Sequence, residues 1–194
     1  MNFRQLLAKE ISLPAAELDQ LTHHYEKLRE WNSRMNLIRI QSLDELVRLH
    51  YCESIFLAET LPQGQLRLAD VGSGAGFPGI PIAAHRPETR ATLVESHQRK
   101  AVFLRQASVQ LNNIEVIAVR AESLSVRYDW VVSRAVRPIL VLGLNISSNF
   151  ALLISEDELR SLPEPSRVVK SPWGRRRIAA MFHVEHDTIG GSRG

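Results

Sequence analysis

The sequence predicts an α/β fold in which a doubly wound parallel sheet carries helices on both faces and follows a helical segment. Two observations predict it. In residues 1–62 apolar side chains recur at steps of three and four, and from Leu66 onward short apolar runs alternate with amphipathic stretches. Strands that alternate with helices form parallel sheets with right-handed crossovers. We therefore expect one α/β unit preceded by helices.

Two packed helices are expected in residues 1–62. The first is indicated by an apolar stripe formed by Leu18, Leu21, Tyr25, Leu28 and Trp31. The second begins at Ser42, which forms a capping box with Glu45, and Pro62 stops it. His50 lies on the apolar stripe of this second helix, so we expect it to pack between helices.

Five strands are predicted from the apolar runs, at Leu66–Val71, Ala91–Glu95, Ile114–Arg120, Trp130–Ser133 and Phe150–Ile154. Helices are expected between them at Ile80–His85 and Gln98–Leu111. Beyond Ser155 three prolines interrupt the pattern, and Gly190–Gly194 is expected to be a frayed tail. The chain is thus expected to comprise a helical extension at 1–62, a ligand-binding α/β core at 63–155, and a compressed C-terminal part with a basic tail at 156–194.

Composition argues against several classes of protein. With 44% hydrophobic and 23% charged residues among 194, the chain is in the globular range, and no apolar run reaches the ~18 residues of a membrane span. The first residues lack the pattern of a secretory signal, so we expect a cytoplasmic protein without a membrane partner. Cys52 is the only cysteine, which excludes an internal disulfide and a zinc site with two thiolates. His183-Val184-Glu185-His186 offers no evident third ligand, and we expect no metal.

The glycine-rich segment Asp70–Gly79 follows the first predicted strand and precedes a helix. Gly74, Gly76 and Gly79 fit the spacing G-x-G-x-x-G, although a tight turn alone would explain glycines at this place. Open sheets bind ligands at the carboxyl ends of their strands, and glycine lets the backbone come close to a ligand. The position of the segment therefore favours a binding loop.

Glu95 ends the second predicted strand, where a carboxylate can accept hydrogen bonds from ribose hydroxyls. On this ground NAD and S-adenosylmethionine both remain open. Ala121-Glu122, which could contact an adenine edge, and the acidic Asp70 favour the second, because a cationic sulfonium without a pyrophosphate is attracted by nearby acids. A P-loop hydrolase is excluded, since no Gly-Lys-Ser/Thr follows the loop.

The cations of this chain are 20 Arg and 4 Lys. A GC-rich genome would explain the excess of arginine equally well, but guanidinium also binds phosphates and stacks on bases. One acid-free stretch, Ser166–Arg177, contains Arg167, Lys170, Arg175, Arg176 and Arg177. We expect these side chains to be free for a polyanion, with a solvated tail as the alternative, and Trp173 among them is a candidate for stacking on bases.

Several segments together resemble a known family; they are Asn36-Leu37, His50 with Glu53-Ser54-Ile55, Asp70–Ile82, Leu93–Ser96 and Ser133-Arg134-Ala135. They are similar to the bacterial glucose-inhibited division protein B family, the small-subunit rRNA guanine-N7 methyltransferases, over roughly Leu18–Leu140. The resemblance implies a seven-stranded Rossmann-like methyltransferase sheet with an N-terminal helical extension. It also implies S-adenosylmethionine as cofactor, N7 of a guanine in the 530 loop of 16S rRNA as target, and 16S rRNA or the small ribosomal subunit as partner.

Carried over by position, the resemblance implies cofactor contacts at Gly72, Phe77, Ala121, Glu122 and Arg134, to which the ribose argument adds Glu95. RNA contacts are expected at Arg137, Arg167, Lys170, Arg175, Arg176 and Arg177. No catalytic base is expected, because guanine N7 already carries a lone pair.

The chain departs from the family at two places. Glu53 stands where the family usually has aspartate, and Ser155-Glu156 stands where a strand usually ends in Lys-Gly. The missing Lys-Gly leaves an inactive RNA-binding relative as an alternative. A small-molecule methyltransferase, which would share the glycine loop and Glu95 but need no basic surface, is a second alternative.

Overall fold

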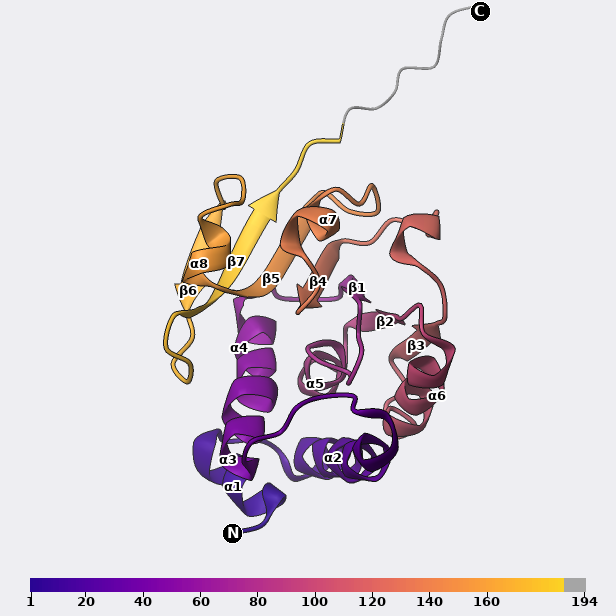
Figure 1. Ribbon diagram of the computed structural model, residues 1–194, viewed down its shortest axis with the longest axis vertical. Coiled ribbons are helices and arrows are strands. Elements are labelled where there is room, and N and C mark those ends of the chain that lie inside the picture. The colour runs from indigo at the N-terminus through magenta and orange to yellow at the C-terminus, as the bar shows by residue number, and fades with distance from the viewer. Residues whose placement is uncertain (187–194) are drawn as a thin grey trace, which may run out of the picture.

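The fold is a seven-stranded sheet between two layers of helices (Figure 1). The computed structural model describes residues 1–186. The strand order is β3-β2-β1-β4-β5-β7-β6. The first five strands are parallel, and β7 runs antiparallel to both of its neighbours, β5 and β6. This arrangement confirms the predicted α/β class.

The strands are β1 (Arg67–Val71), β2 (Arg90–Val94), β3 (Ile114–Ile117), β4 (Trp130–Arg134), β5 (Asn149–Ser155), β6 (Arg167–Lys170) and β7 (Arg177–His183). The α-helices are α1 (Phe3–Glu10), α2 (Ala15–Met35), α3 (Leu43–Leu46), α4 (Glu53–Thr60), α5 (Gly79–His85), α6 (Gln98–Ala107), α7 (Pro138–Leu142) and α8 (Glu156–Leu159). A π-helical turn, η1 (Val47–Cys52), joins α3 to α4, and a 3₁₀ turn, η2 (Ala121–Ser123), follows β3.

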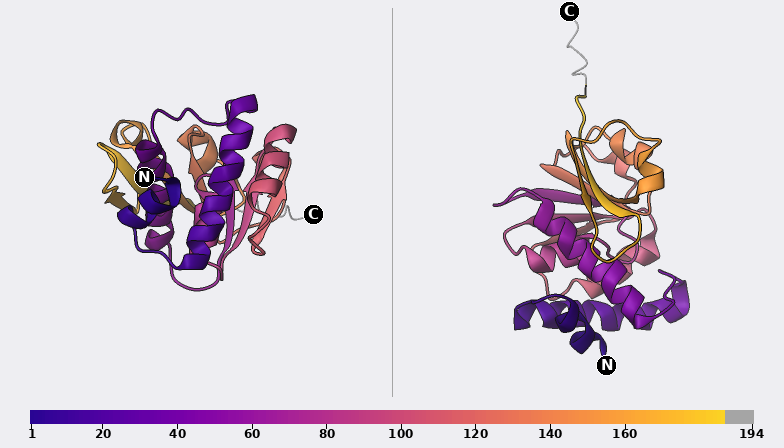
Figure 2. Two further views of the ribbon diagram at one scale, coloured as in Figure 1. Left: turned by 90° about the horizontal axis from the view of Figure 1, so that it is seen from below. Right: turned by 90° about the vertical axis from the view of Figure 1, so that its left-hand side faces the viewer.

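The N-terminal helices form an outer layer over one face of the sheet. In Figure 1, α4, α5 and α6 lie against this face and α7 and α8 against the other, and the side view in Figure 2 shows the indigo helices α1 and α2 outside the first layer. One hydrophobic cluster runs through this side and joins Leu7, Leu21 and Leu57 to Leu93 of β2 and Met181 of β7. The core therefore crosses both of the expected boundaries, at 62 and at 155.

Two features of the N-terminal helices differ from the prediction. The helix α1 was not expected; it begins at a capping box between Asn2 and Gln5 and buries Phe3 and Leu7. The second predicted helix is not continuous, because the π-helical turn η1 interrupts it between α3 and α4. A π turn keeps nearly the same apolar pattern as an α-helix, so the stripe could not reveal it.

The strand predictions are confirmed for β1 to β5, although β3 ends at Ile117 rather than at Arg120. No strand is predicted from the apolar pattern beyond Ser155, but this part forms the antiparallel pair β6 and β7, which completes the seven-stranded sheet that the resemblance implies. The prolines that obscured the pattern lie in the connections, with Pro163 and Pro165 before β6 and Pro172 between the two strands. The predicted tail at 190–194 lies outside the described residues.

Within residues 1–186 no helix is long and apolar enough to cross a membrane. The described part of the chain also has no group of three His, Cys, Asp or Glu side chains arranged to hold a metal ion. The two histidines of the His183–His186 segment bond elsewhere: His183 Nδ1 lies 2.9 Å from Asn149 Oδ1, and His186 Nε2 lies 2.7 Å from the Ser147 carbonyl oxygen.

Candidate functional site

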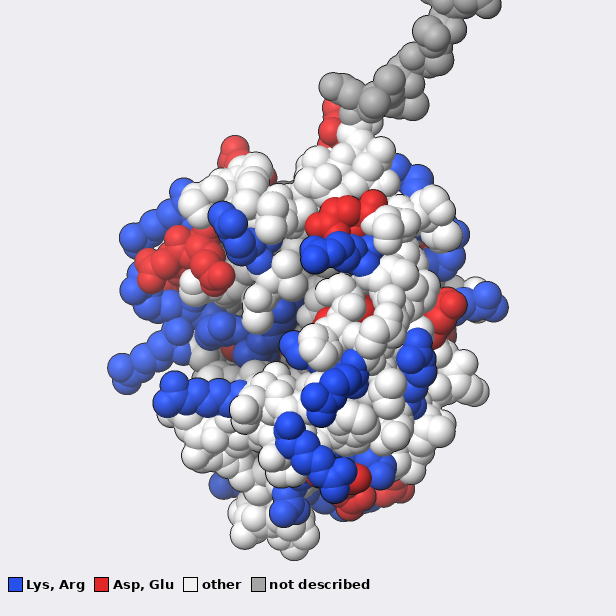
Figure 3. Space-filling model, turned by 45° about the vertical axis from the view of Figure 1, so that its right-hand side comes forward, with Lys and Arg blue, Asp and Glu red and all other residues white. Residues whose placement is uncertain are grey.

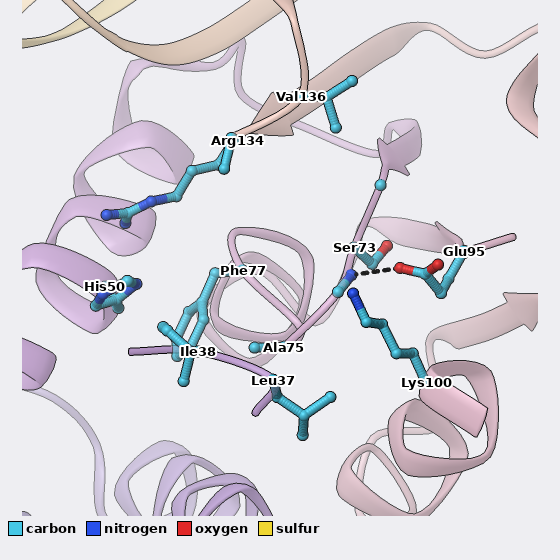
Figure 4. A pocket seen from close by; sticks show the side chains of 13 residues that line it. Leu37, Ile38, His50, Ser73, Ala75, Phe77, Glu95, Lys100, Arg134 and Val136 are labelled. Carbon is cyan, nitrogen blue, oxygen red and sulfur yellow. Dashed lines mark hydrogen bonds between the residues drawn. The ribbon is translucent and has the colours of Figure 1, made fainter. Parts of the chain in front are cut away.

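A cavity of about 360 Å³ opens at the carboxyl ends of β1, β2 and β4. Four of the predicted residues, Gly72, Phe77, Glu95 and Arg134, line it. Figure 4 shows Glu95 at one end of the cavity and Arg134 at the other. The cavity occupies the place at which parallel sheets bind ligands.

A smaller cavity of about 200 Å³ adjoins it and contains the two remaining predicted cofactor contacts, Ala121 and Glu122. The two cavities share Gly72, Glu95 and Val136. The six predicted contacts therefore form one continuous site, although they come from four different strand ends.

The turn after β1 needs glycine for two reasons. Gly72, Gly74 and Gly76 have φ of +73°, +52° and +88°, a region that L side chains rarely adopt. In addition, a Cβ on Gly72 would lie 2.3 Å from Val136 Cγ2, a contact that no side chain could make without displacing its neighbour. Glycine at position 72 is therefore required by its backbone conformation and by packing against Val136, which follows β4.

Asp70 bonds the end of the glycine turn on the side away from the cavity and does not line the cavity. Its side chain is fully buried, and its Oδ2 accepts a hydrogen bond of 3.1 Å from the Gly79 N–H. Burial raises the pKa of this carboxyl to about 7. Asp70 was expected to favour a cationic ligand as a nearby acid; its side chain bonds the start of α5 and does not line either cavity.

Glu95 lies in the wall common to both cavities and is held by the backbone. Its Oε2 accepts the Gly74 N–H at 3.0 Å and its Oε1 accepts the His97 N–H at 2.8 Å. Only 7% of the residue is exposed. A carboxylate oxygen has lone pairs for more than one hydrogen bond, so Glu95 can hold the turn and still accept from a ligand.

His24 of the outer helix α2 holds the same turn from the opposite side. Its Nε2 lies 2.9 Å from the Ala75 carbonyl oxygen, and its Nδ1 lies 3.1 Å from the Tyr51 hydroxyl. The carbonyl requires a donor, so Nε2 carries the proton and Nδ1 accepts from Tyr51. Burial lowers the pKa of His24 to about 4, which keeps the ring neutral. No local pattern in the sequence indicates this contact, because His24 and Ala75 are 51 positions apart.

His24 should make the folded state sensitive to mild acid. Because its pKa is about 4 in the folded state and about 6.5 when unfolded, the unfolded chain binds the additional proton, and stability falls as pH decreases below 6.5. Between pH 7 and pH 5.5 this group alone should cost about 1 kcal/mol of unfolding free energy. His24→Gln keeps a donor for Ala75 and removes the titration, so urea unfolding at the two pH values should show a loss smaller by that amount. An equal loss in both proteins would contradict the assignment.

Phe77 lines the cavity, but its ring is only 5% exposed. It packs among the rings of His24, His50 and Tyr51, with centroids 5.1, 5.0 and 4.9 Å away. Its main role in this structure is to anchor the glycine turn to the helical layer.

Arg134 is mostly buried and interacts with the π-helical turn and α4. Its Nη1 donates to the Leu49 carbonyl and lies 3.4 Å from Glu53 Oε2. Burial and the neighbouring charge of Arg177 lower the pKa of Arg134 to about 10, so it remains a cation. Arg134 therefore takes part in a buried ion pair with Glu53 at the edge of the cavity.

Three of the five cations between Ser166 and Arg177 are not free. Arg177 Nη2 lies 3.2 Å from Glu53 Oε2, Arg176 bonds Asp157, and Lys170 Nζ lies 3.3 Å from Glu156. The expectation of an unpartnered run is wrong for them, because folding brings acids from α4 and α8 alongside. Within residues 1–186, exposed Arg137, Arg167 and Arg175 have no ion pair; in Figure 3, Lys and Arg side chains border a hollow in the left half of the view.

Trp173 is also occupied by packing, since its ring meets Phe56 of α4 at a centroid distance of 6.3 Å, edge to face. The cavity is also lined by residues that are not among the predicted contacts, including Leu37, Ile38, His50, Lys100 and Val136. Leu37 and Ile38 lie in the connection between α2 and α3, and Lys100 lies on α6 next to Glu95 in Figure 4. His50 was expected between helices, but it forms part of the cavity wall.

Comparison with known proteins places these features in a family. The family model described as rRNA small subunit methyltransferase G (GidB) matches residues 17–150. A ribosomal RNA small subunit methyltransferase G of Nitrosospira multiformis is 38% identical over 129 residues, covering 64% of this chain and 59% of that protein. Its counterpart in Roseiflexus sp. (strain RS-1) is 36% identical over 141 residues, covering 69% and 60%. The chain thus spans about three fifths of the length of these curated relatives.

Solved structures show the same fold at low identity. A ribosomal protein L11 methylase from Lactobacillus delbrueckii subsp. bulgaricus has a TM-score of 0.56 at 15% identity, over 68% of this chain and 77% of that chain. Aeropyrum pernix fibrillarin, solved with bound S-adenosyl-L-methionine, has a TM-score of 0.51 at 15% identity, over 68% and 73%. These likenesses confirm the methyltransferase-like fold. With its family model matched over residues 17–150, this chain belongs to the GidB family, rRNA small subunit methyltransferase G.

Proposed function

We propose that this protein transfers a methyl group from S-adenosylmethionine to N7 of a guanine in 16S rRNA. The observation that carries the proposal is the pair of adjoining cavities that meet at Glu95, at the carboxyl ends of the strands of a GidB-family chain. A ligand that extends through both cavities would place an adenosine in the smaller one and its reactive end in the larger one.

The residues present fit this cofactor by their chemistry. Glu95 offers a carboxylate to the ribose hydroxyls, and the smaller cavity joins the apolar Val94, Val119 and Ala121 to Glu122, as suits a purine ring with polar edges. The methionyl part would lie along the turn at Gly72–Ala75. When bound, S-adenosylmethionine supplies a methyl group on a sulfonium.

The chain itself would contribute position and environment rather than acid or base catalysis. Guanine N7 has a free lone pair, so no side chain needs to remove a proton, and alignment of the reacting atoms is the main requirement. His24 and Glu95 fix the glycine turn from two sides, which gives the site a rigid floor. Glu53 offsets part of the positive charge of Arg134 at the edge of the cavity.

The target base must be accessible to this cavity. In a paired A-form helix N7 faces a deep, narrow groove that side chains cannot enter, so the guanine would be unpaired or turned out of its helix. A partly apolar cavity with aromatic Phe77 and His50 in its wall is suited to receive a flat ring.

Methyl transfer from labelled S-adenosylmethionine, followed by mapping of the modified base, tests the proposal directly. Free 16S rRNA and purified small subunits should be compared, and label at N7 of one guanine is expected in at least one of them. Cofactor binding without transfer to either RNA would favour an inactive RNA-binding relative. Label on small molecules, with no salt-sensitive RNA binding, would favour a small-molecule methyltransferase.

RNA contacts are proposed at Arg137, Arg167 and Arg175, which are those of the predicted RNA contacts that are exposed and have no acidic partner within residues 1–186. Each phosphate contact releases counterions, so replacing all three by alanine should reduce the slope of log K against log salt by up to roughly 0.7 to 0.9 per contact. Filter binding at several salt concentrations measures this slope. Arg67→Ala with Arg90→Ala, at the opposite ends of β1 and β2, provides the control. The same change of slope per charge in both variants would contradict a localised RNA surface.

A further inference from the structure

The π-helical turn η1 exposes functional groups that a regular helix would not. The Glu53 N–H bonds the carbonyls of Arg48 and His50, so the Leu49 carbonyl, its partner in a regular α-helix, accepts from Arg134 instead. π-helical turns are rare and occur frequently at functional sites. This turn carries His50 into the cavity wall.

The imidazole ring of His50 has no hydrogen-bond partner within residues 1–186. Its Nδ1 is enclosed by protein without a partner, whereas Nε2 is not enclosed in this way. Its ring lies 5.0 Å from that of Phe77, at the end of the cavity that also contains Ile38 and Arg134 (Figure 4). Nε2, the ring nitrogen that protein does not enclose, is therefore the one that a ligand atom in the cavity could reach.

The protonation state of the His50 ring determines which of its nitrogens can donate a hydrogen bond. Burial and the positive charges of Arg134 and Arg177 lower the pKa of His50 to about 3, so the ring is neutral and has one N–H. A proton on Nδ1 would be buried without an acceptor and close to two guanidinium groups. We therefore assign the proton to Nε2, which makes His50 a donor toward the cavity.

Guanine and adenine differ in the exocyclic group on C6, which lies beside N7, the nitrogen proposed to be methylated. Guanine presents N7 and O6, both acceptors, whereas adenine presents N7 and an amino donor. Arg134 is a poor reader of this difference, since it is already engaged by Leu49 and Glu53. Lys100 lies at the other end of the cavity in Figure 4, near Glu95.

We propose that His50 Nε2 donates a hydrogen bond to O6 of the target guanine and so selects guanine over purines that carry an amino group at this position. The inference rests on the proposed function and adds the residue that would recognise the base. The apolar side chains of Leu37 and Ile38, in the same wall, would contact the ring faces.

The test compares RNA with guanine or 2,6-diaminopurine at the mapped position, since diaminopurine keeps N7 and has an amino group in place of O6. The wild type should prefer guanine in kcat/KM. His50→Phe should reduce the guanine value by about 5- to 100-fold and leave the diaminopurine value nearly unchanged, so that the preference disappears. His50→Gln, whose amide nitrogen can take the place of Nε2, should recover part of the guanine rate, and the shorter His50→Asn should not.

His183→Gln, an exposed histidine on β7, is the matched control and should keep the wild-type preference. Cofactor affinity measured by calorimetry should stay within about twofold for all folded variants. If the wild type methylates guanine and His50→Phe keeps the same preference, the inference is overturned and the proposed function stands. If His50→Phe does not fold, equal guanine rates for the Gln and Asn variants overturn it. A wild type that methylates no guanine in the RNA would overturn both.

Discussion

Replacing Glu95 by glutamine should weaken S-adenosylmethionine binding by about 1.5 to 3 kcal/mol, or roughly 10- to 150-fold in Kd. Glutamine keeps the size of the side chain but loses the charged acceptor for the ribose hydroxyls. It also brings an amide NH2 against one of the backbone donors, since Gly74 N–H and His97 N–H each bond one carboxylate oxygen. Both effects act on the same binding loop, and titration calorimetry measures their sum.

Cofactor analogues that lack one ribose hydroxyl separate the two effects. The wild type should discriminate against such an analogue more strongly than Glu95→Gln does, because the variant has already lost most of that interaction. Glu115→Gln, on β3 and away from both cavities, controls for loss of a carboxylate in general. Equal discrimination by wild type and variant would show that Glu95 only holds the turn.

The site residues that could be predicted from the sequence are those that directly follow, or end, a predicted strand. The turn after β1, Glu95 after β2 and Arg134 at the end of β4 each follow an apolar run, and a parallel sheet brings such ends together. Their position relative to one another therefore followed from the order of the elements. The fold class could be predicted for the same reason, because β1, β2 and β3 alternate with α5 and α6 in the chain.

The parts that the sequence did not predict depend on contacts between distant segments. Glu53 and Arg177 are 124 positions apart, and no local pattern connects them. The cations of the basic stretch were therefore expected to have no acidic partners. His50 was assigned to a helix–helix contact because its apolar spacing does not distinguish a π turn from an α-helix. The run Ile178–Phe182 is apolar throughout and could have indicated β7, but the prolines before it obscured the signal.

Glu53→Gln should be the most destabilising of these changes, because Glu53 is the acid that balances two cations. The carboxylate is fully buried, and it lies 3.4 Å from Arg134 Nη1 and 3.2 Å from Arg177 Nη2. Ser171 donates a further hydrogen bond of 3.1 Å to it. Removing one member of a buried ion pair leaves an uncompensated charge in the interior, which typically costs about 3 to 5 kcal/mol.

For a chain of this length the loss corresponds to a decrease in Tm of about 6 to 20 °C. Thermal unfolding of Glu53→Gln should therefore be compared with that of Asp157→Asn, which breaks the exposed pair with Arg176 and should cost no more than about 1 kcal/mol. The double variant Glu53→Gln with Arg177→Gln should recover part of the loss, since it removes one of the two unbalanced cations. Similar decreases for Glu53→Gln and Asp157→Asn would mean that Glu53 is not the link between α4, β4 and β7. In that case the backbone pairing of β7 with β5, together with apolar contacts such as that of Trp173 with Phe56, would hold the C-terminal strands to the rest of the site.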